Sequence, residues 1–392
     1  MTLKQSLHSI WNVAKREIHR LTSKPIYFFC MLIAPALCVV FFLSLMQNGL
    51  PTNLPIAVVD MDGSATSRNL IRQLDAFEQT EVVYKTATFD DARREMQKGN
   101  IYGIFYIPKN FAVEATTGKQ PTLSFYTNGT YLIAASLLFR DMKTISVLAG
   151  ASVGLQTGLA KGYTTDQIMG QLQPVVVDTH AIGNPWLNYS VYLNNTILPG
   201  VLQLMIFLVT VFSIGTEIKY STARQWLQTG GNSLTTSLLG KLLPQTVIFT
   251  LVALMCCAAL YGFNAFPLNS GWMPMISAMI LLVLASQAVG VFMIGVLPTL
   301  RLGLSFASLF GMIAFSIVGF SYPVLGMDPT LQALSDLFPL RHYFLIYVDQ
   351  ALNGRDLFYS WSEYVWLAGF LILPFLIGKN LKNALLYFKY IP

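Results

Sequence analysis

Residues 26–46 read IYFFCMLIAPALCVVFFLSLM and contain no charged side chain in 21 positions. At 1.5 Å per residue, an α-helix of this length is about 31 Å long, which matches the roughly 30 Å hydrocarbon core of a bilayer. The stretch therefore predicts a membrane-spanning helix. Its long basic N-terminal flank and the lack of an obvious small-residue cleavage site favour an uncleaved span over a signal peptide.

The composition of the whole chain agrees with a membrane protein. Of 392 residues, 54% are apolar and only 11% are charged, whereas soluble domains carry about 25% charged residues. This excludes an ordinary soluble enzyme, a disordered chain and a coiled coil. The four cysteines lie in apolar runs and do not form a disulfide framework. The four histidines lack ligand spacing, so we expect no metal site.

Five further apolar stretches predict spans, near residues 195–215, 242–263, 272–300, 302–322 and 364–377. Six spans place both termini on one side of the membrane. That side then holds 12 basic and 2 acidic residues, against 13 basic and 17 acidic on the other. The positive-inside rule therefore predicts cytoplasmic termini. Residues 144–160 are a possible seventh span, but they are short and rich in Gly and Ser, which favours a helix of the outer domain.

The region 49–191 is polar enough to form an extracytoplasmic domain. Expected strands at 54–59, 80–88, 101–107 and 122–126 alternate with expected helices at 67–77, 90–98 and 110–117, which predicts an α/β fold. The run Asp60, Asp62, Ser64 is compatible with a cation loop. It lacks the spacing of an EF-hand, so a helix capped by Ser64 or Thr66 is favoured.

The chain shows no motif for its own chemistry. Gly240-Lys241 is not followed by Ser or Thr, so no Walker A loop is present, and we expect neither catalytic residues nor a cofactor. Within the bounds given above, the spans contain no charged residue, which disfavours an ion-driven carrier. Their amides, Asn195, Gln203 and Gln287 among them, either bond between helices or line a pathway. Energy for transport would then come from a partner.

A segment before the first span is a candidate moving part. In residues 5–22, apolar side chains recur at intervals of three and four, opposite a basic face with Lys15, Arg16 and Arg20. This pattern predicts an amphipathic helix in the membrane interface with Trp11 as an anchor. Simple anchoring and a mechanical role both remain open.

The cytoplasmic loop 216–241 is a second candidate. We expect a short helix over 217–227, a break at Gly230-Gly231 and a restart after Asn232. Such a helix beneath the bilayer can dock on a soluble partner, although a plain connector is the alternative. The candidate contact residues are Glu217, Lys219, Tyr220, Ser221, Thr222 and Arg224.

On the outer side, residues 320–360 do not leave the membrane cleanly. Glycine and prolines interrupt two short apolar stretches, which predicts a re-entrant hairpin whose irregular backbone must be satisfied by protein or water. We expect it to be the outer gate of a pathway. Its candidate residues are Gly319, Pro323, Met327, Pro329 and Pro339.

Three motifs in this order resemble the permease subunits of the second class of ABC exporters, in the subgroup with a large extracytoplasmic domain between the first two spans. The outer domain opens with VVDMDGSATSR at residues 58–68, and the hairpin carries the family's Gly, Pro and Met-x-Pro pattern. The cytoplasmic loop is similar to a Glu-x-Glu-x-Gly-Thr coupling pattern at Glu217 and Thr222. Lys219 and Ser221 depart from that pattern, which implies a partner matched to this chain.

The resemblance implies an α-helical polytopic fold with four parts: an interface helix (1–24), a first transmembrane helix (25–48), the extracytoplasmic domain (49–191) and a five-helix transmembrane region (192–392). It implies a cytoplasmic ABC ATPase subunit and a second permease, identical or paralogous, in the bilayer of a bacterial inner membrane. A periplasmic adaptor protein is a further candidate partner, and nucleic acid is not one. We expect export of a hydrophobic or amphipathic substrate such as a drug or lipid; the alternative is a membrane-anchored receptor that acts through its outer domain.

Overall fold

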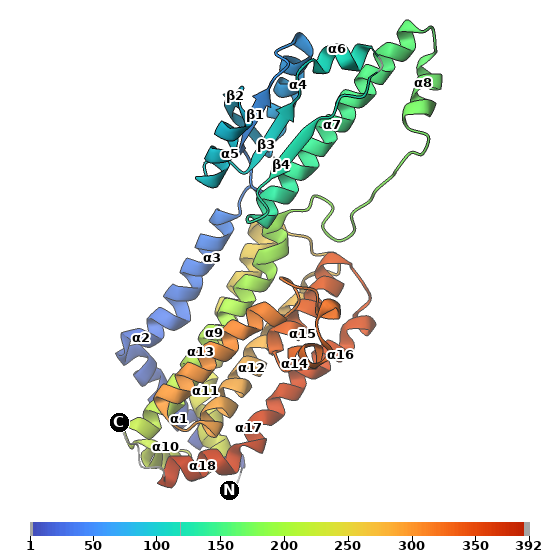
Figure 1. The fold of residues 1–392 in the computed structure, drawn as a ribbon. Helices are drawn as coiled ribbons and strands as arrows, with labels where there is room; N and C mark the ends of the chain where they lie inside the picture. Colours follow the sequence, from blue (N-terminus) through green and yellow to red (C-terminus); the bar gives the residue numbers. More distant parts are fainter. Residues whose placement is uncertain (1–2, 118, 388–392) are drawn as a thin grey trace. The chain divides into compact units, whose positions relative to one another are not determined.

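A computed structural model describes residues 3–117 and 119–387 (Figure 1). The chain divides into two compact units. Unit 1 comprises Met1–Gln47 and Ala181–Pro392, and unit 2 comprises Asn48–His180. The apolar spans belong to unit 1, and the small sheet belongs to unit 2.

Among the residues that the structure describes, unit 1 contains five helices that are long and apolar enough to cross a membrane. The first covers Pro25–Leu45 and is formed by α2 (Pro25–Phe28), η1 (Phe29–Ile33) and α3 (Ala34–Leu45). The others are α9 (Tyr189–Lys219), α11 (Leu234–Cys257) continued by η2 (Ala258–Phe263), α12 (Trp272–Val296) and α13 (Leu300–Ile317). The predicted helical polytopic fold is therefore confirmed.

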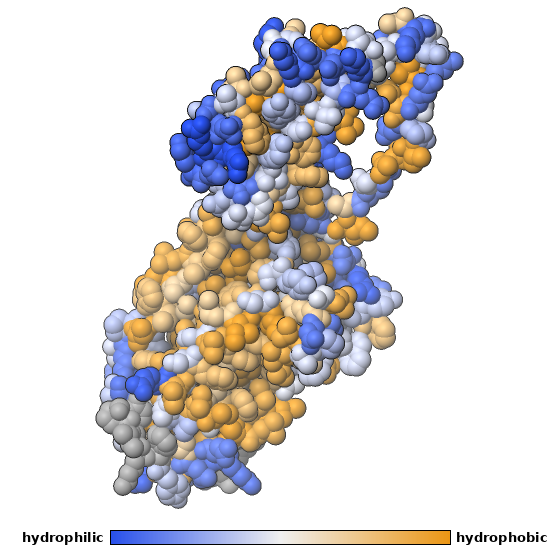
Figure 2. Space-filling view, in the orientation of Figure 1, coloured by the Kyte–Doolittle hydropathy of each residue, from blue (hydrophilic) through white to orange (hydrophobic). Residues whose placement is uncertain are grey.

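A sixth span exists if one bent pair of helices is counted as a single crossing. It runs through α16 (Leu357–Gly369), η5 (Phe370–Ile372) and α17 (Leu373–Leu376), and bends by 40° before α18 (Gly378–Tyr387). Figure 2 shows a mostly hydrophobic surface over the helices of unit 1. On α11, Leu239, Leu243, Val247 and Leu251 recur every four residues and are exposed, as expected for a helix face that meets lipid.

The structure corrects one boundary that matters for function. The third span begins at Leu234, eight residues before the predicted start at residue 242, with Ser233 as its N-cap residue. Likewise, α9 extends to Lys219. Glu217 and Lys241, which lie outside the predicted bounds of the spans, are therefore part of the continuous helices α9 and α11.

The helices α9 and α12 form the centre of unit 1, and small residues bring their backbones close together. A side chain added at Gly290 of α12 would place its Cβ 2.9 Å from the Cβ of Thr210 on α9. Close approach at small residues is how helices associate in membranes, where apolar burial alone gives little driving force. Both helices are largely buried within unit 1.

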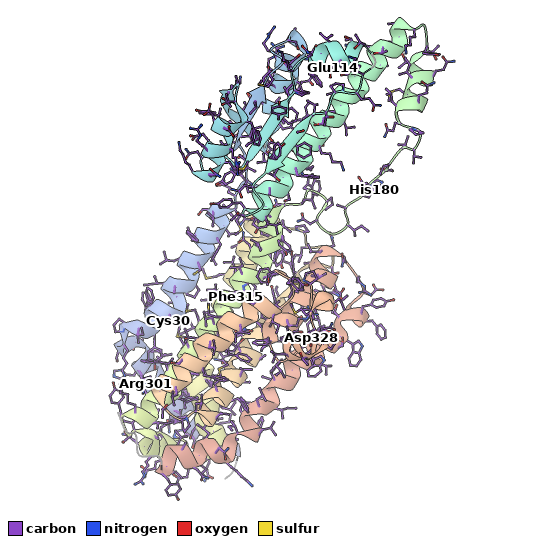
Figure 3. The ribbon with its side chains drawn as sticks, viewed as in Figure 1. Cys30, Glu114, His180, Arg301, Phe315 and Asp328 are labelled. Atoms are coloured by element: carbon purple, nitrogen blue, oxygen red, sulfur yellow. The ribbon has the colours of Figure 1, made fainter. Side chains whose placement is uncertain are left out.

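One end of this bundle is formed by α1 (Leu3–Ser23), α10 (Ala223–Thr229) and α18, and we call it the basic end (Figure 1). The other end carries η3 (Val324–Gly326), α14 (Pro329–Ser335), α15 (Pro339–Ile346) and η4 (Tyr347–Leu352). Figure 3 labels Arg301 at the start of α13 and Asp328 next to α14. Both α14 and α15 begin at a proline, whose missing N–H has no role at the first helical position.

Unit 2 is built on a four-stranded sheet in the order β2-β1-β3-β4. Strand β1 (Leu54–Asp60) pairs in parallel with β2 (Thr80–Thr86) and β3 (Gly103–Ile107), and β4 (Ser124–Thr127) pairs antiparallel with β3. The connecting helices are α4 (Ala65–Asp75), α5 (Phe89–Gln97) and α6 (Phe111–Thr116), followed by α7 (Leu132–Ala160) and α8 (Thr165–Leu172). The predicted α/β character is confirmed.

The turn after β1 caps a helix. Ser64 accepts a hydrogen bond from the backbone N–H of Ser67 at 3.0 Å, and the Asp60 carboxylate accepts bonds from Asp62 N, Gly63 N and the Ser67 hydroxyl. These contacts confirm the helix-cap interpretation. Residues 144–160 lie within α7, which belongs to unit 2 and is not among the helices long and apolar enough to span a membrane.

Candidate functional site

At the basic end, α1 lies directly against α11. A Cβ added at Gly240 would fall 2.6 Å from the Ile10 carbonyl oxygen and 2.7 Å from the Val13 Cβ, so only glycine permits this approach. The helix turns Val13, Ala14 and Glu17 inward, and it exposes Leu7, Trp11 and Ile18. The helix therefore has apolar residues on two sides: one group is exposed, and the other packs against the bundle together with the charged Glu17.

The inward stripe of α1 contributes to a group of five charged side chains, which we call the ion cluster. Its members are Arg16, Glu17 and Arg20 from α1, Glu217 from α9 and Lys241 from α11. Glu217 and Lys241 are fully buried, and Glu17 is 1% exposed. Three elements that are distant in the sequence thus meet at one polar centre.

Glu217 is the acceptor on which the cluster converges. Arg16 donates to it with both ends of its guanidinium, at 2.7 Å to Oε1 and 3.0 Å to Oε2. Arg20 and the Thr222 hydroxyl also donate to this carboxylate. Arg20 also donates a hydrogen bond to the Thr216 hydroxyl oxygen at 2.6 Å. The paired bonds from Arg16 fix both direction and distance, as a planar guanidinium does best.

Lys241 joins the two carboxylates. Its Nζ donates to Glu17 Oε2 at 2.6 Å and to Glu217 Oε1 at 3.0 Å. The ammonium also lies 5.0 Å from the centre of the Trp226 ring on α10. Gln245, one helical turn further along α11, donates to Glu17 Oε1 at 3.1 Å. Lys241 therefore contacts residues of three other helices, α1, α9 and α10.

The electrostatics of the cluster explain why these charges tolerate burial. A buried carboxylate or ammonium costs several kcal/mol unless partners with good geometry replace water. Three cations face two anions here, and each carboxylate accepts at least two bonds. Burial alone would lower the pKa of Arg16, but hydrogen bonding to Glu217 and the charge of that carboxylate raise it above its usual value. Arg16 therefore remains charged.

The predicted contact residues of loop 216–241 divide into two groups. Glu217 and the half-buried Thr222 point inward, whereas Lys219, Tyr220, Ser221 and Arg224 are exposed. Tyr220 lies between two cations, with Lys24 and Lys219 each 5.6 Å from its ring centre. The exposed group forms a surface, which we call the α9–α10 turn, directly behind the ion cluster.

The predicted helix over 217–227 is wrong in its first half. The chain continues α9 to Lys219, reverses at residues 220–222 and restarts as α10 at Ala223. Ser221 adopts a left-handed conformation with φ of 55°. The bond from Thr222 to Glu217 closes this turn, so the pair predicted as contact residues instead joins α9 to the start of α10.

The predicted interface-helix residues also divide. Trp11 and Lys15 are exposed, while Arg16 and Arg20 are turned into the ion cluster. The structure therefore brings together two groups of residues that the sequence placed on separate segments. The predicted gate residues lie elsewhere, at the other end of unit 1.

In the hairpin at that end, Gly319 has a φ of 111°, and a Cβ there would fall 2.8 Å from a guanidinium nitrogen of Arg341. Arg341 itself donates to the Val318 carbonyl at 2.8 Å. Met327 packs on the main apolar core, and Pro329 and Pro339 open their helices. Pro323 precedes η3. The glycine and the prolines thus determine the backbone conformation of the hairpin, and the hydrogen bond from Arg341 to Val318 stabilises it.

The predicted pathway residues do not converge on one site. Asn195 donates to the Val191 carbonyl of its own helix at 3.0 Å. The Gln203 amide has no hydrogen-bond partner among the described residues. Gln287 of α12 accepts from the Thr246 hydroxyl of α11 at 2.7 Å, so it bonds between helices.

Sequence reasoning missed the roles of Glu17, Lys241 and Arg341. A signal for Lys241 exists: Ser233 is a good N-cap residue, and a helix that starts there carries Lys241 into the apolar run. An isolated cation in an apolar helix implies an anion on a neighbouring element. The identity of that anion depends on how α1 packs, which local sequence does not encode.

Comparison with known proteins adds family information. Residues 25–378 match the family described as ABC-2 family transporter protein. A stretch of 155 residues is 29% identical to a linearmycin resistance permease protein of Bacillus subtilis. That stretch covers 40% of this chain and 38% of the relative, so the two are compared over less than half of their lengths.

Proposed function

The chain belongs to the ABC-2 family of transporter proteins, and from this premise we propose that it is the membrane-spanning permease subunit of an ATP-driven exporter. A separate ABC ATPase subunit would bind and hydrolyse ATP. A second permease, identical or paralogous, would complete the pathway. The termini and the basic end would face the cytoplasm of a bacterial cell, with unit 2 outside the inner membrane.

The ion cluster is the observation that carries this proposal. It lies behind the exposed α9–α10 turn and connects that turn to α1 and α11 through Glu217 and Lys241. A force applied to the turn is therefore applied to three elements together. Rigid displacement of packed helices about such a junction is a common way to switch a protein between two arrangements.

An ATPase can change the permease only if it contacts two arrangements of the turn with different free energies. Tyr220 and Arg224 provide exposed groups for such contacts. Arg224 already reaches α18, where its guanidinium donates to the Leu386 carbonyl at 3.2 Å. The same partner would thereby influence the last helix of the chain.

The cargo is proposed to be hydrophobic or amphipathic. The name of the Bacillus subtilis relative connects it with resistance to linearmycin. By analogy, we propose that this chain removes a harmful apolar compound from the membrane or cytoplasm.

The test separates partner binding from coupling. The chain is purified in mild detergent from native membranes, and the co-purifying ATPase and its hydrolysis rate are measured. Replacing Tyr220 and Arg224 by Glu should reduce co-purification by about tenfold or more, as loss of central interface residues does. Glu217→Gln should leave co-purification intact but reduce export of the cargo. Lys15→Glu, on the exposed face of α1, is the matched control and should change neither.

Two outcomes would contradict the proposal. If the chain purifies without an ATPase and binds only partners of unit 2, the receptor interpretation replaces it. If the ATPase co-purifies but the Tyr220 and Arg224 variants bind it normally, the α9–α10 turn is not the contact surface.

A further inference from the structure

A groove on unit 1 lies between α11, α12, α17 and the start of α18, and no residue of the ion cluster lines it. Its volume is about 520 Å³, within the range of about 300–1,000 Å³ typical of ligand pockets. Leu238, Leu242 and Thr246 line it from α11, Gln287 and Val291 from α12, and Phe375 from α17. We call it the lateral groove.

The rim of the lateral groove faces the bilayer. Leu239, Leu243 and Val247 of α11 are exposed, and Phe375 is 72% exposed. These residues are apolar and belong to helices that span the membrane or complete a span. A molecule dissolved in the bilayer therefore reaches the groove sideways, without crossing water.

The floor of the groove contains one polar pair in apolar surroundings. Gln287 is 3% exposed, and its amide oxygen accepts from Thr246 at 2.7 Å. Its amide nitrogen, Nε2, has no hydrogen-bond partner among the described residues. Leaving a buried N–H unpaired costs free energy, and lipid chains offer it no acceptor. An oxygen brought by an occupant would bond to this N–H after the Gln287 side chain turns towards the groove, because the nitrogen is buried in this structure.

The shape of the groove selects the occupant. Its lining on α11 runs from Leu234 to Val247, about 20 Å at 1.5 Å per residue. A groove of this length accommodates an extended hydrocarbon chain.

The position of the polar pair fixes the depth of binding. Gln287 lies nine residues before the end of α12 at Val296, or about 14 Å from the basic end of that helix. The pair therefore lies within the half of the bilayer nearest the basic end, close to its middle. An occupant must be long and apolar, with an oxygen well inside its body.

We propose that the lateral groove binds one elongated amphiphile from the leaflet at the basic end, with a hydroxyl or carbonyl oxygen bonded to Gln287, and that this is where cargo is loaded. The assignment of the occupant as cargo rests on the proposed export function. Binding itself does not, because it requires neither ATP nor a partner. The groove is separate from the ion cluster and from the hairpin.

The test uses the full chain in lipid nanodiscs with a photoactivatable long-chain alcohol as the probe. Labelled peptides should map to α11 and α17. Unlabelled alcohol should compete about tenfold better than the alkane of equal length, since one hydrogen bond to a buried amide has about that effect. Gln287→Leu should abolish the preference for the alcohol, and Ala288→Leu, which fills the groove, should abolish labelling. Gln203→Leu removes another buried amide and should change nothing.

Each contrary result is distinct. Equal competition by alcohol and alkane in the unmodified chain, or labelling spread over all lipid-facing helices, would overturn the site even if a variant fails to fold. A disulfide between copies formed by Leu243→Cys would make the groove an interface between chains, which also overturns it. If an ATPase co-purifies but labelling is not saturable, the proposed ligand site in the lateral groove is wrong and the export function is unaffected. If the groove is labelled but no ATPase co-purifies, the proposed export function is wrong and the ligand site is unaffected.

Discussion

At the scale of single residues, Lys241 is the charge on which the basic end depends most. It is fully buried on an apolar helix, and it bonds carboxylates from two other elements. Glu17 has Lys241 as its ion-pair partner and Gln245 as a neutral one, whereas Glu217 also has Arg16 and Arg20. Loss of Lys241 would therefore leave Glu17 as a buried anion without a cation.

We predict that Lys241→Met destabilises the protein by about 3–5 kcal/mol, the usual cost of removing one partner of a buried ion pair. The double variant Glu17→Gln with Lys241→Met should recover much of this loss, because no unpaired anion remains. Thermal unfolding in detergent measures both. Lys15→Met, on the exposed face of α1, should have almost no effect. A double variant as unstable as the single one would contradict the coupling of Glu17 and Lys241.

At the scale of elements, the contact between α1 and α11 decides whether the ion cluster can form. The contact needs Gly240, where a Cβ would meet backbone as well as a side chain of α1. A backbone carbonyl cannot move away as a flexible side chain can. The helix pair must therefore separate if residue 240 is enlarged.

We predict that Gly240→Val displaces α1, with a cost of about 1–3 kcal/mol from overpacking. Limited proteolysis should then cut within α1, and export should fall because the α9–α10 turn no longer connects to α1. Gly369→Ala in α16 is the control, since a Cβ there has no atom within 4 Å. If α1 in the Gly240→Val variant stays as protected as in the parent chain, the close contact is not required.

The same scale shows what local sequence could predict. Long apolar runs and the alternation of strands and helices predicted the spans and the α/β insertion, because each signal lies within one element. The reversal at Ser221 was missed, since a non-glycine residue in the left-handed region gives no strong sequence signal. The ion cluster was missed because its charges come from α1, α9 and α11, and their meeting depends on packing between elements.

At the scale of the whole molecule, the two units have separate apolar cores and different surfaces. The apolar clusters of unit 2 are built from its own strands and helices, with Val58, Phe105 and Leu138 at their centre. Unit 1 has a separate core on α9 and α12. Unit 2 therefore holds a water-facing fold of its own, and unit 1 holds the spans.

The distribution of charge predicts on which side each unit is exposed. The basic end carries exposed Lys15, Lys219, Arg224 and Lys379, and basic segments next to spans remain in the cytoplasm. Unit 2 follows an odd number of spans counted from α1, which predicts that it lies on the opposite side. This orientation would place the α9–α10 turn where an ATPase works.

We predict that Arg93→Cys in unit 2 reacts with a membrane-impermeant maleimide in cells whose cytoplasmic membrane is intact and accessible from outside. Gln225→Cys in α10 should react only after the cytoplasmic membrane is permeabilised. Both positions are exposed in the structure, so access depends on the side of the membrane. The native cysteines are a low background, because Cys256 and Cys257 are buried and Cys30 and Cys38 lie in the first span. Labelling of Gln225→Cys in intact cells would place the α9–α10 turn outside, and ATP-driven coupling through it would then be impossible.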